Sequence, residues 1–193
     1  MLPHTDGSPP KKTTAPLGKA DFDKLVKLHF DGFNSEVRTE GDKILEVRYR
    51  TKDRPVMWAV VTVSPCLDCM PMELDKWKAK EAELRTINLE ILKDSPDITW
   101  EMGATRMNGA PVIYTYQVGT SAGAGSGSAD IGGGGYSFTD NYVAYYNDGV
   151  NQIRVVSAYK DDPATKAELI KMAPKEDLQA LALAFLDVYT HAW

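Results

Sequence analysis

Both cysteines of the chain lie in one short segment, and they are the residues best suited to chemistry. Cys66 and Cys69 are separated by two residues in the sequence SPCLDCMPMELDKW. An apolar, strand-like run, MWAVVTV, precedes them, and a helical pattern follows. Thiols at this spacing can form a redox pair, half of a metal site or a local disulfide. The surrounding elements must distinguish these three possibilities.

The cysteine segment resembles the dithiol segment of the thioredoxin family. In that family a buried strand precedes the pair, and a helix N-terminus lowers the pKa of the first thiol. The sequence GAPV at 109–112 looks like the family's cis-proline segment. The resemblance implies a thiol–disulfide oxidoreductase in which Cys66 is the nucleophile, Cys69 the resolving thiol and Pro111 the proline that faces the substrate.

Three features of the chain disagree with this resemblance. Pro65 stands where the family usually has tryptophan before its first cysteine, and the carboxylate of Asp68 disfavours a thiolate. The thioredoxin fold needs a strand and a helix between the helix that ends near Leu92 and Pro111. The sequence ITWEMGATRMNGAP instead has the pattern of a hairpin arm.

A metal site is the second possibility, but the histidines are poorly placed to supply further ligands. Zinc takes four ligands, commonly from two cysteine pairs, and this chain has one pair. His4 lies in a proline-rich segment and His191 is two residues from the end, which also disfavours a histidine-based active site. We predict no metal and no cofactor. A local Cys66–Cys69 disulfide is the third possibility, with two reduced thiols as its alternative, and export to the cell envelope favours the disulfide.

The glycine-rich segment 119–135 is the next candidate. Eight of the seventeen residues in GTSAGAGSGSADIGGGG are glycine. A phosphate-binding loop needs a lysine before a helix, and no lysine occurs from 119 to 147. We therefore predict a mobile linker or lid.

Tyrosines crowd the C-terminal half of the chain. Tyrosine combines a large contact area with a polar tip, which suits binding surfaces, although several could instead pack under helices. Tyr145 and Tyr146 must point to opposite faces of one strand, so both are core only if both faces are covered. The candidate binding residues are Tyr114, Tyr116, Tyr142, Tyr145 and Tyr146.

Bulk composition excludes several classes of protein. The chain has 193 residues, 43% of them apolar, and a net charge of −5. No basic run exceeds two residues, so we expect no nucleic-acid partner. No apolar run approaches the roughly 18 residues that span a bilayer. Residues 1–19 are polar and proline-rich, which predicts a flexible leader before a single domain over 20–193.

The order of predicted elements indicates an α+β fold. Strands are expected at 44–50 and 57–63, a helix at 72–92 with Trp77 on its apolar face, a short helix after Pro163 and a closing helix from Pro174. Hairpins are expected at 98–118 and 142–159, with turns at Asn108-Gly109 and Asp148-Gly149 that need positive φ at both positions. Residues 21–30 match helix and strand spacing equally. Consecutive hairpins make a mainly antiparallel sheet, against which the amphipathic helices pack.

This order resembles the PsbP-like fold group, which includes the DcrB-type envelope lipoproteins. The similarity covers residues 22–193 and is carried by the helix ELDKWKAKEAELRTINLEIL, the arm NGAPVIYTYQV, the hairpin VAYYNDGVNQIRVVSAY and the closing helix KEDLQALALAFLDVY. It implies an α/β/α sandwich. Members of the group are mostly binding or assembly factors.

The leading hypothesis is therefore a non-catalytic binding or assembly module of the bacterial cell envelope with a protein partner. The leader resembles the linker that follows a lipoprotein anchor, so we expect a periplasmic or envelope location and a lipid anchor in the full-length precursor. An ordinary N-terminus and a cytoplasmic location are the alternative. The rival functions are an oxidoreductase using Cys66 and Cys69, and an enzyme inhibitor or immunity-type protein.

Overall fold

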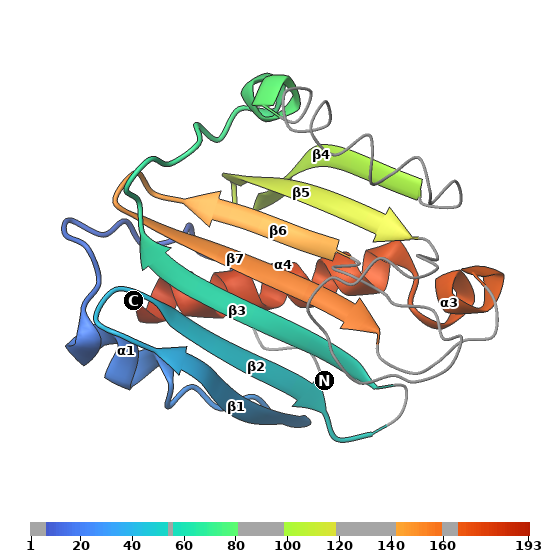
Figure 1. The fold of residues 1–193 in the computed structure, drawn as a ribbon, viewed down its shortest axis with the longest axis horizontal. Helices are drawn as coiled ribbons and strands as arrows, with labels where there is room; N and C mark the ends of the chain where they lie inside the picture. The colour runs from blue at the N-terminus through green and yellow to red at the C-terminus, as the bar shows by residue number, and fades with distance from the viewer. Residues whose placement is uncertain (1–6, 54–55, 81–98, 119–141, 160–165) are drawn as a thin grey trace.

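The computed structural model describes residues 7–53, 56–80, 99–118, 142–159 and 166–193. These ranges form a seven-stranded sheet of order β1-β2-β3-β7-β6-β5-β4 (Figure 1), in which all neighbours are antiparallel. The strands are β1 Phe33–Glu40, β2 Leu45–Thr51, β3 Met57–Pro65, β4 Thr99–Met107, β5 Ala110–Val118, β6 Tyr142–Asn147 and β7 Asn151–Tyr159. The helices are α1 Lys19–Leu25, α3 Lys166–Met172 and α4 Lys175–Ala192, and residues 74–80 are also helical.

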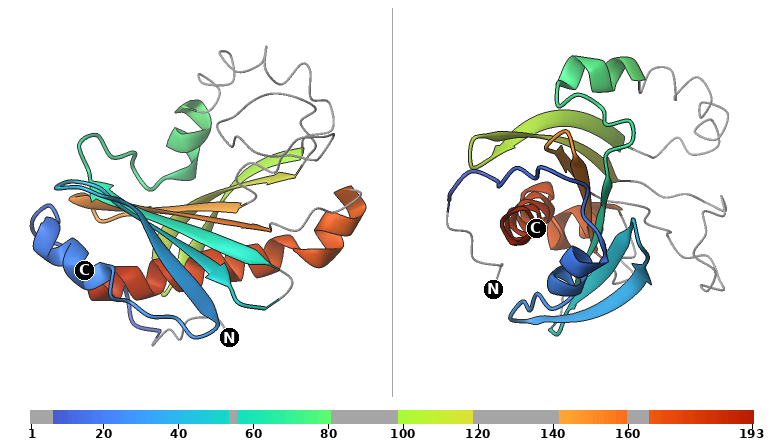
Figure 2. Two further views of the ribbon diagram at one scale, coloured as in Figure 1. Left: turned by 60° about the horizontal axis from the view of Figure 1, so that its bottom comes forward. Right: turned by 90° about the vertical axis from the view of Figure 1, so that its left-hand side faces the viewer.

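The sheet curves around α4, which packs mainly on β7 and β6 (Figure 2). The helical residues 74–80 lie on the opposite side of the sheet. This arrangement confirms the predicted α+β fold with helices packed against an antiparallel sheet. We call the side that carries α4 the inner face and the other side the outer face. The part of the 72–92 helix beyond residue 80, and the glycine-rich segment 119–135, lie outside the described residues.

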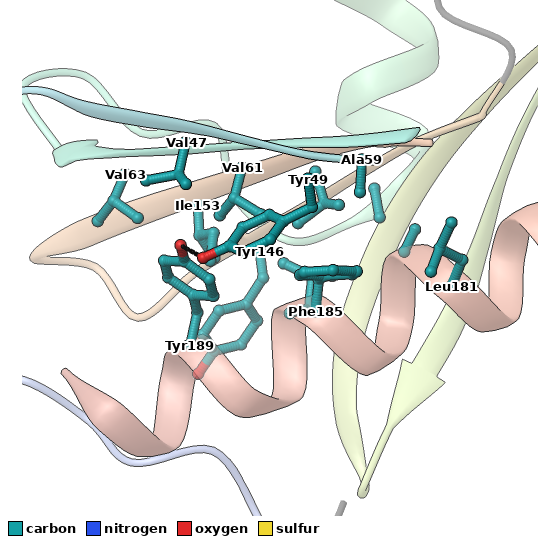
Figure 3. Close-up of a cluster of buried hydrophobic side chains, with 14 of the residues drawn as sticks. Val47, Tyr49, Ala59, Val61, Val63, Tyr146, Ile153, Leu181, Phe185 and Tyr189 are labelled. Carbon is teal, nitrogen blue, oxygen red and sulfur yellow. Dashed lines mark hydrogen bonds between the residues drawn. The ribbon is translucent and has the colours of Figure 1, made fainter. Parts of the chain in front are cut away.

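Side-chain alternation along the strands builds the inner face. Leu45, Val47 and Tyr49 of β2 are buried, as the alternating sequence predicts. Their neighbours on β3, from Ala59 to Val63, repeat the pattern, because Tyr49 pairs with Ala59 and Leu45 with Val63. The apolar side chains of α4 meet this surface, as Figure 3 shows for Leu181, Phe185 and Tyr189.

A pair of buried tyrosine hydroxyls joins α4 to the sheet. The hydroxyl oxygens of Tyr49 and Tyr189 are 2.6 Å apart (Figure 3). Burial raises the pKa of Tyr49 to about 12, although the hydrogen bond from Tyr189 partly offsets this. Burial also raises the pKa of Tyr189. Both hydroxyls therefore stay neutral, and one of them donates to the other within the buried layer. Phe30 packs edge-on against Tyr49 with ring centroids 4.9 Å apart.

The two hairpins turn by different mechanisms. Asn108 and Gly109 have φ angles of 48° and 85°, which confirms the predicted turn with positive φ at both positions. The same mechanism was expected at Asp148 and Gly149, and there it is wrong. Of these two residues only Gly149 has positive φ, at 91°. Asp148 instead accepts hydrogen bonds from the backbone N–H groups of Val150 and Asn151, both at 2.8 Å, so its side chain stabilises the turn.

The N-terminal segment, which composition predicts to be flexible, lies against the β6–β7 turn and the end of α4. The backbone N–H and the hydroxyl of Thr13 both donate to Asp148 at 2.6 Å. The Leu17 N–H donates to the fully buried Asn151. Polar contacts of this kind are invisible to an argument based on apolar area. Of the ambiguous residues 21–30, the first five belong to α1, which ends at Leu25 and buries Phe22, and residues 26–30 are neither helix nor strand.

Two tyrosine-to-phenylalanine substitutions should separate a paired hydroxyl from an unpaired one. Tyr189→Phe leaves the Tyr49 hydroxyl buried without its partner, so the free energy of unfolding should fall by about 1–3 kcal/mol. The Tyr142 hydroxyl is buried and has no hydrogen-bond partner among the described residues. Tyr142→Phe should therefore leave stability unchanged or slightly higher. Urea unfolding of both variants measures this, and equal losses would contradict the assignment.

Asp148 should make stability depend on acid pH. Burial raises the pKa of Asp148, but its hydrogen bonds to Asn151, Thr13 and Val150 outweigh burial and hold the pKa below the usual value. The resulting stability is fully present above about pH 4 and is lost as pH falls through the lowered pKa. Asp148→Ala should cost about 1–3 kcal/mol at pH 7. Its deficit should shrink below pH 4, whereas the exposed Asp53→Asn control should match the parent throughout.

Candidate functional site

The two cysteines form a pair at disulfide distance, as predicted. Their Cα atoms are 5.0 Å apart, and the bridge closes a loop over Leu67 and Asp68. The backbone N–H of Cys66 donates to the Val150 carbonyl at 2.8 Å, which ties the loop to the β6–β7 turn. Leu67 is 90% exposed. The bridge therefore holds a protruding apolar side chain at one end of the sheet.

The structure does not assemble the thioredoxin arrangement around this pair. The helical residues begin at Leu74, so neither cysteine lies at a helix N-terminus. Pro111 stands at the start of β5, which is separated from β3 by β7 and β6. At normal strand spacing this places Pro111 roughly 14 Å from the end of β3. It therefore does not face the cysteines, and the geometry lends no support to the redox alternative.

The five candidate tyrosines lie on two different faces. Tyr142 and Tyr146 are buried on the inner face, and Tyr114 and Tyr116 share that face because they pair with Ala144 and Tyr142. Only Tyr145 points to the outer face, where it is partly exposed. The five side chains thus do not form one continuous binding surface.

Tyr114 is fixed in place at the edge of the inner face. Its hydroxyl donates to Glu101 at 2.7 Å, and Lys175 lies 2.6 Å from the same carboxylate and 4.7 Å above the Tyr114 ring. The hydrogen bond from Lys175 is the main cause that lowers the pKa of Glu101. The ring lies directly over Gly103, where a Cβ atom would overlap it. This corner is packed and internally paired.

The outer face contains a hollow beside the disulfide. Its volume is about 290 Å³, close to the lower end of the range for small-molecule sites. It lies between the strands β3, β7 and β6 and the segment that runs from the disulfide into the helical residues 74–80. The lining residues are Thr62, Ser64, Asp68, Met70, Trp77, Tyr145, Tyr146, Asn147, Gln152, Ile153 and Arg154.

One wall of the hollow is aromatic. The rings of Trp77 and Tyr145 are 4.8 Å apart at an angle of 42°. The indole N–H of Trp77 donates to the Pro71 carbonyl at 3.0 Å, which sets the direction of the ring. Tyr145 comes from β6, so the wall joins a strand to the covering segment.

Several other lining residues of the hollow are polar, and some of them hydrogen-bond to protein groups around it. Asn147 donates to the Met70 carbonyl at 2.9 Å. Gln152 donates to the Ser64 hydroxyl at 3.0 Å, and the Cys69 sulfur is 3.8 Å from the Gln152 carbonyl oxygen. These contacts connect the disulfide segment to β3, β6 and β7. The polar side chains are therefore positioned before any ligand binds.

Sequence reasoning identified Tyr145 and the disulfide but missed the other members of this site. Trp77 was assigned to the apolar face of a helix. The alternation of Gln152 and Arg154 with buried Ile153 and Val155 carried a usable signal, because it places two polar side chains on one face of β7. The proximity of Trp77 to that face follows from long-range packing and had no local signal.

A second polar cluster joins the chain termini. Ser8 Oγ is 2.7 Å from His191 Nε2, and His191 Nδ1 is 2.8 Å from the backbone carbonyl of Asp187 and 3.3 Å from its carboxylate. Asn108 donates to that carboxylate at 2.6 Å. Because both Asp187 atoms are acceptors, Nδ1 carries the proton and Nε2 of the neutral ring accepts from Ser8. The connectivity is that of a Ser–His–Asp triad.

Other contacts indicate that this cluster fastens the N-terminal segment. Lys11 donates to the His191 carbonyl at 2.7 Å, and the Trp193 indole donates to the Lys11 carbonyl at 3.1 Å. A catalytic serine also needs donors for the developing oxyanion. In the described part of the chain no such donors are established next to Ser8. The hydrogen bonds that hold the N-terminal segment to the end of α4 are established.

Comparison with known proteins adds no family. No family model, curated protein or solved structure matches the chain. Among the described residues there is no group of three or more His, Cys, Asp and Glu side chains arranged for a metal ion. Within the same residues, no helix has the length and apolar character to cross a membrane. The PsbP-like resemblance stays a prediction.

Removing the disulfide should loosen the hollow more than it destabilises the domain. The bridge closes a very short loop, so replacing Cys66 and Cys69 by serine should lower the free energy of unfolding by about 2 kcal/mol at most. Hydrogen exchange at the backbone amides of 66–72 should rise in the variant, while exchange in β7 should stay slow. Reduction of the parent protein should reproduce both effects. A large loss of stability with no change in exchange would contradict this account.

Proposed function

We propose that the protein is a non-catalytic binding or assembly module of the bacterial cell envelope. Its partner, a protein, binds at the disulfide end of the outer face. The observation that carries this proposal is the exposed Leu67, which the Cys66–Cys69 bridge holds beside a preformed hollow.

The energetic argument concerns Leu67. A large apolar side chain that is 90% exposed contributes little hydrophobic free energy to the folded protein on its own. Burial of the same side chain in a partner would contribute favourably to the free energy of binding. A short covalent loop limits the conformational freedom that the side chain would lose on binding. The neighbouring hollow is a concave surface next to the protruding Leu67 side chain. A protein surface with a complementary pocket would bury Leu67.

The disulfide supports the proposed location. Disulfides persist in oxidising compartments, such as the bacterial periplasm, and are uncommon in the cytosol. The polar leader and the PsbP-like resemblance favour the same compartment, with a lipid anchor in the full-length precursor. In the described structure residues 8–17 run along the domain, so a membrane anchor before them would hold the domain close to the bilayer.

Photo-crosslinking tests the proposed surface. A benzoylphenylalanine residue at position 67 in the native bacterial cell should give a discrete adduct, whereas one at position 170 should not. Ile170 is a suitable control because it is also an exposed apolar residue, at 44%, and lies on α3. The partner identified by mass spectrometry should bind the purified protein, and Leu67→Asp should weaken that binding about tenfold or more. Equal adducts at both positions would refute the surface.

Two assays test the non-catalytic character of the protein. Insulin reduction in the presence of a thiol reductant should not exceed background, because the cysteines lack a helix N-terminus and a facing proline. A fluorophosphonate probe should not label Ser8, because the serine serves to fasten the N-terminal segment. Turnover of insulin, or labelling that disappears in Ser8→Ala, would replace the binding module by an enzyme.

A further inference from the structure

We propose that the outer-face hollow is a binding site for a neutral sugar ring. The inference shares with the proposed function only the assumption that the disulfide end of the outer face is the binding end. It assigns the hollow its own ligand, separate from the protein that would bury Leu67. The argument rests on the aromatic wall, the polar side and the charge balance of the hollow.

The aromatic wall suits the apolar face of a pyranose ring. Trp77 and Tyr145 present two adjoining rings, and the hydrogen bond from Trp77 to Pro71 fixes the indole. The C–H groups on one side of a sugar ring form a flat apolar patch, and aromatic rings bury such a patch while their polar tips stay hydrated. A volume of about 290 Å³ accommodates one such ring with part of a second.

The polar side offers both donors and acceptors, and a sugar hydroxyl can serve either. Ser64 accepts from Gln152, so its own hydroxyl proton is available to a ligand. The side-chain amide nitrogen of Asn147 donates to the Met70 carbonyl. The side-chain carbonyl oxygen of Asn147 has no partner among the described residues. The exposed carboxylate of Asp68 adds an acceptor at the rim. An aliphatic ligand would leave these groups unpaired at a cost.

Charge in the hollow favours a neutral ligand. Asp68 and Arg154 contribute one charge of each sign to the lining, so neither an anion nor a cation meets a purely complementary field. Arg154 is also engaged with another group of the protein, which reduces its value as a counter-ion. A hydroxyl-rich neutral ring can hydrogen-bond to both side chains.

Preorganisation of the covering segment favours binding in this small hollow. The disulfide, the Cys66 N–H bond to Val150 and the Asn147 bond to Met70 hold the covering segment against the sheet. Because these groups are already ordered, a ligand does not have to order them on binding. Single sugar rings bind proteins weakly, and a preformed site is one way to reach measurable affinity.

Saturation-transfer NMR with glucose, N-acetylglucosamine and their linear trimers tests the inference. At least one of these sugars, at up to about 10 mM, should receive saturation at its ring protons. Tyr145→Ala should weaken that binding about tenfold, and Tyr145→Phe should retain it because the ring is kept. Asp68→Asn should weaken it several-fold, and since Asp68 is exposed the variant will fold even if Tyr145→Ala does not.

Other outcomes overturn the inference without affecting the proposed function. No saturation transfer to any of the sugars, or transfer that Asp68→Asn and Tyr145→Ala leave unchanged, refutes a sugar site in the hollow. Binding of glycine or L-glutamate in place of the sugars, lost in the same variants, would assign the hollow to a zwitterion. Leu67→Asp should leave sugar binding unchanged while it removes the protein partner, so the two proposals fail separately.

Discussion

Burial of the apolar stripe of α4 against the inner face of the sheet is the constraint on which the rest of the structure depends. Tyr49, Phe185 and Tyr189 form its centre, and the hydroxyl pair within it stays neutral because burial raises the pKa of both tyrosines. Since side chains alternate along a strand, committing every second residue of β2, β3, β6 and β7 to this layer leaves the remaining positions to the outer face. The more exposed polar side chains of these strands, such as Arg48, Thr62 and Gln152, therefore lie on the outer face.

The β6–β7 turn connects that constraint to both ends of the chain. On one side Asp148 and Asn151 bind the N-terminal segment, and on the other Asn147 and Gln152 bind the disulfide segment and β3. The turn can do this because one carboxylate oxygen of Asp148 accepts from two backbone N–H groups of the turn, while the other oxygen accepts from Thr13. A turn built on positive φ at both central residues would not have needed that carboxylate, and Thr13 would have lost its acceptor.

Local patterns predict most of the fold but little of the site. The alternation in β2, the Asn108-Gly109 turn and the stripe of α4 depend on neighbours close in sequence, and all three were predictable. The hollow depends on β3 lying beside β7, which pairs Ser64 with Gln152 across a long stretch of chain. No periodicity carries that information. The split of the tyrosines between the two faces follows from the alternation along β6 and from the pairing of β5 with β6, and a count of tyrosines does not include that pairing.

The outer face at the disulfide end is built in a way that folding alone does not require. A sheet face carrying Gln152, Arg154 and Tyr145 would be well solvated if left open, and an apolar cover would need apolar residues beneath it. Within residues 66–80, the described part of the cover, the contacts with the strands include a few polar ones and one pair of aromatic rings. Because a space remains between the segment and the strands, the dispersion contacts of a packed core are not made there. The Cys66–Cys69 bridge restricts the segment's conformational freedom and so compensates in part for those contacts. Because the disulfide rather than close packing orders this segment, the hollow stays accessible. An accessible, ordered hollow favours a ligand site over a segment that serves only to connect β3 to the following helix.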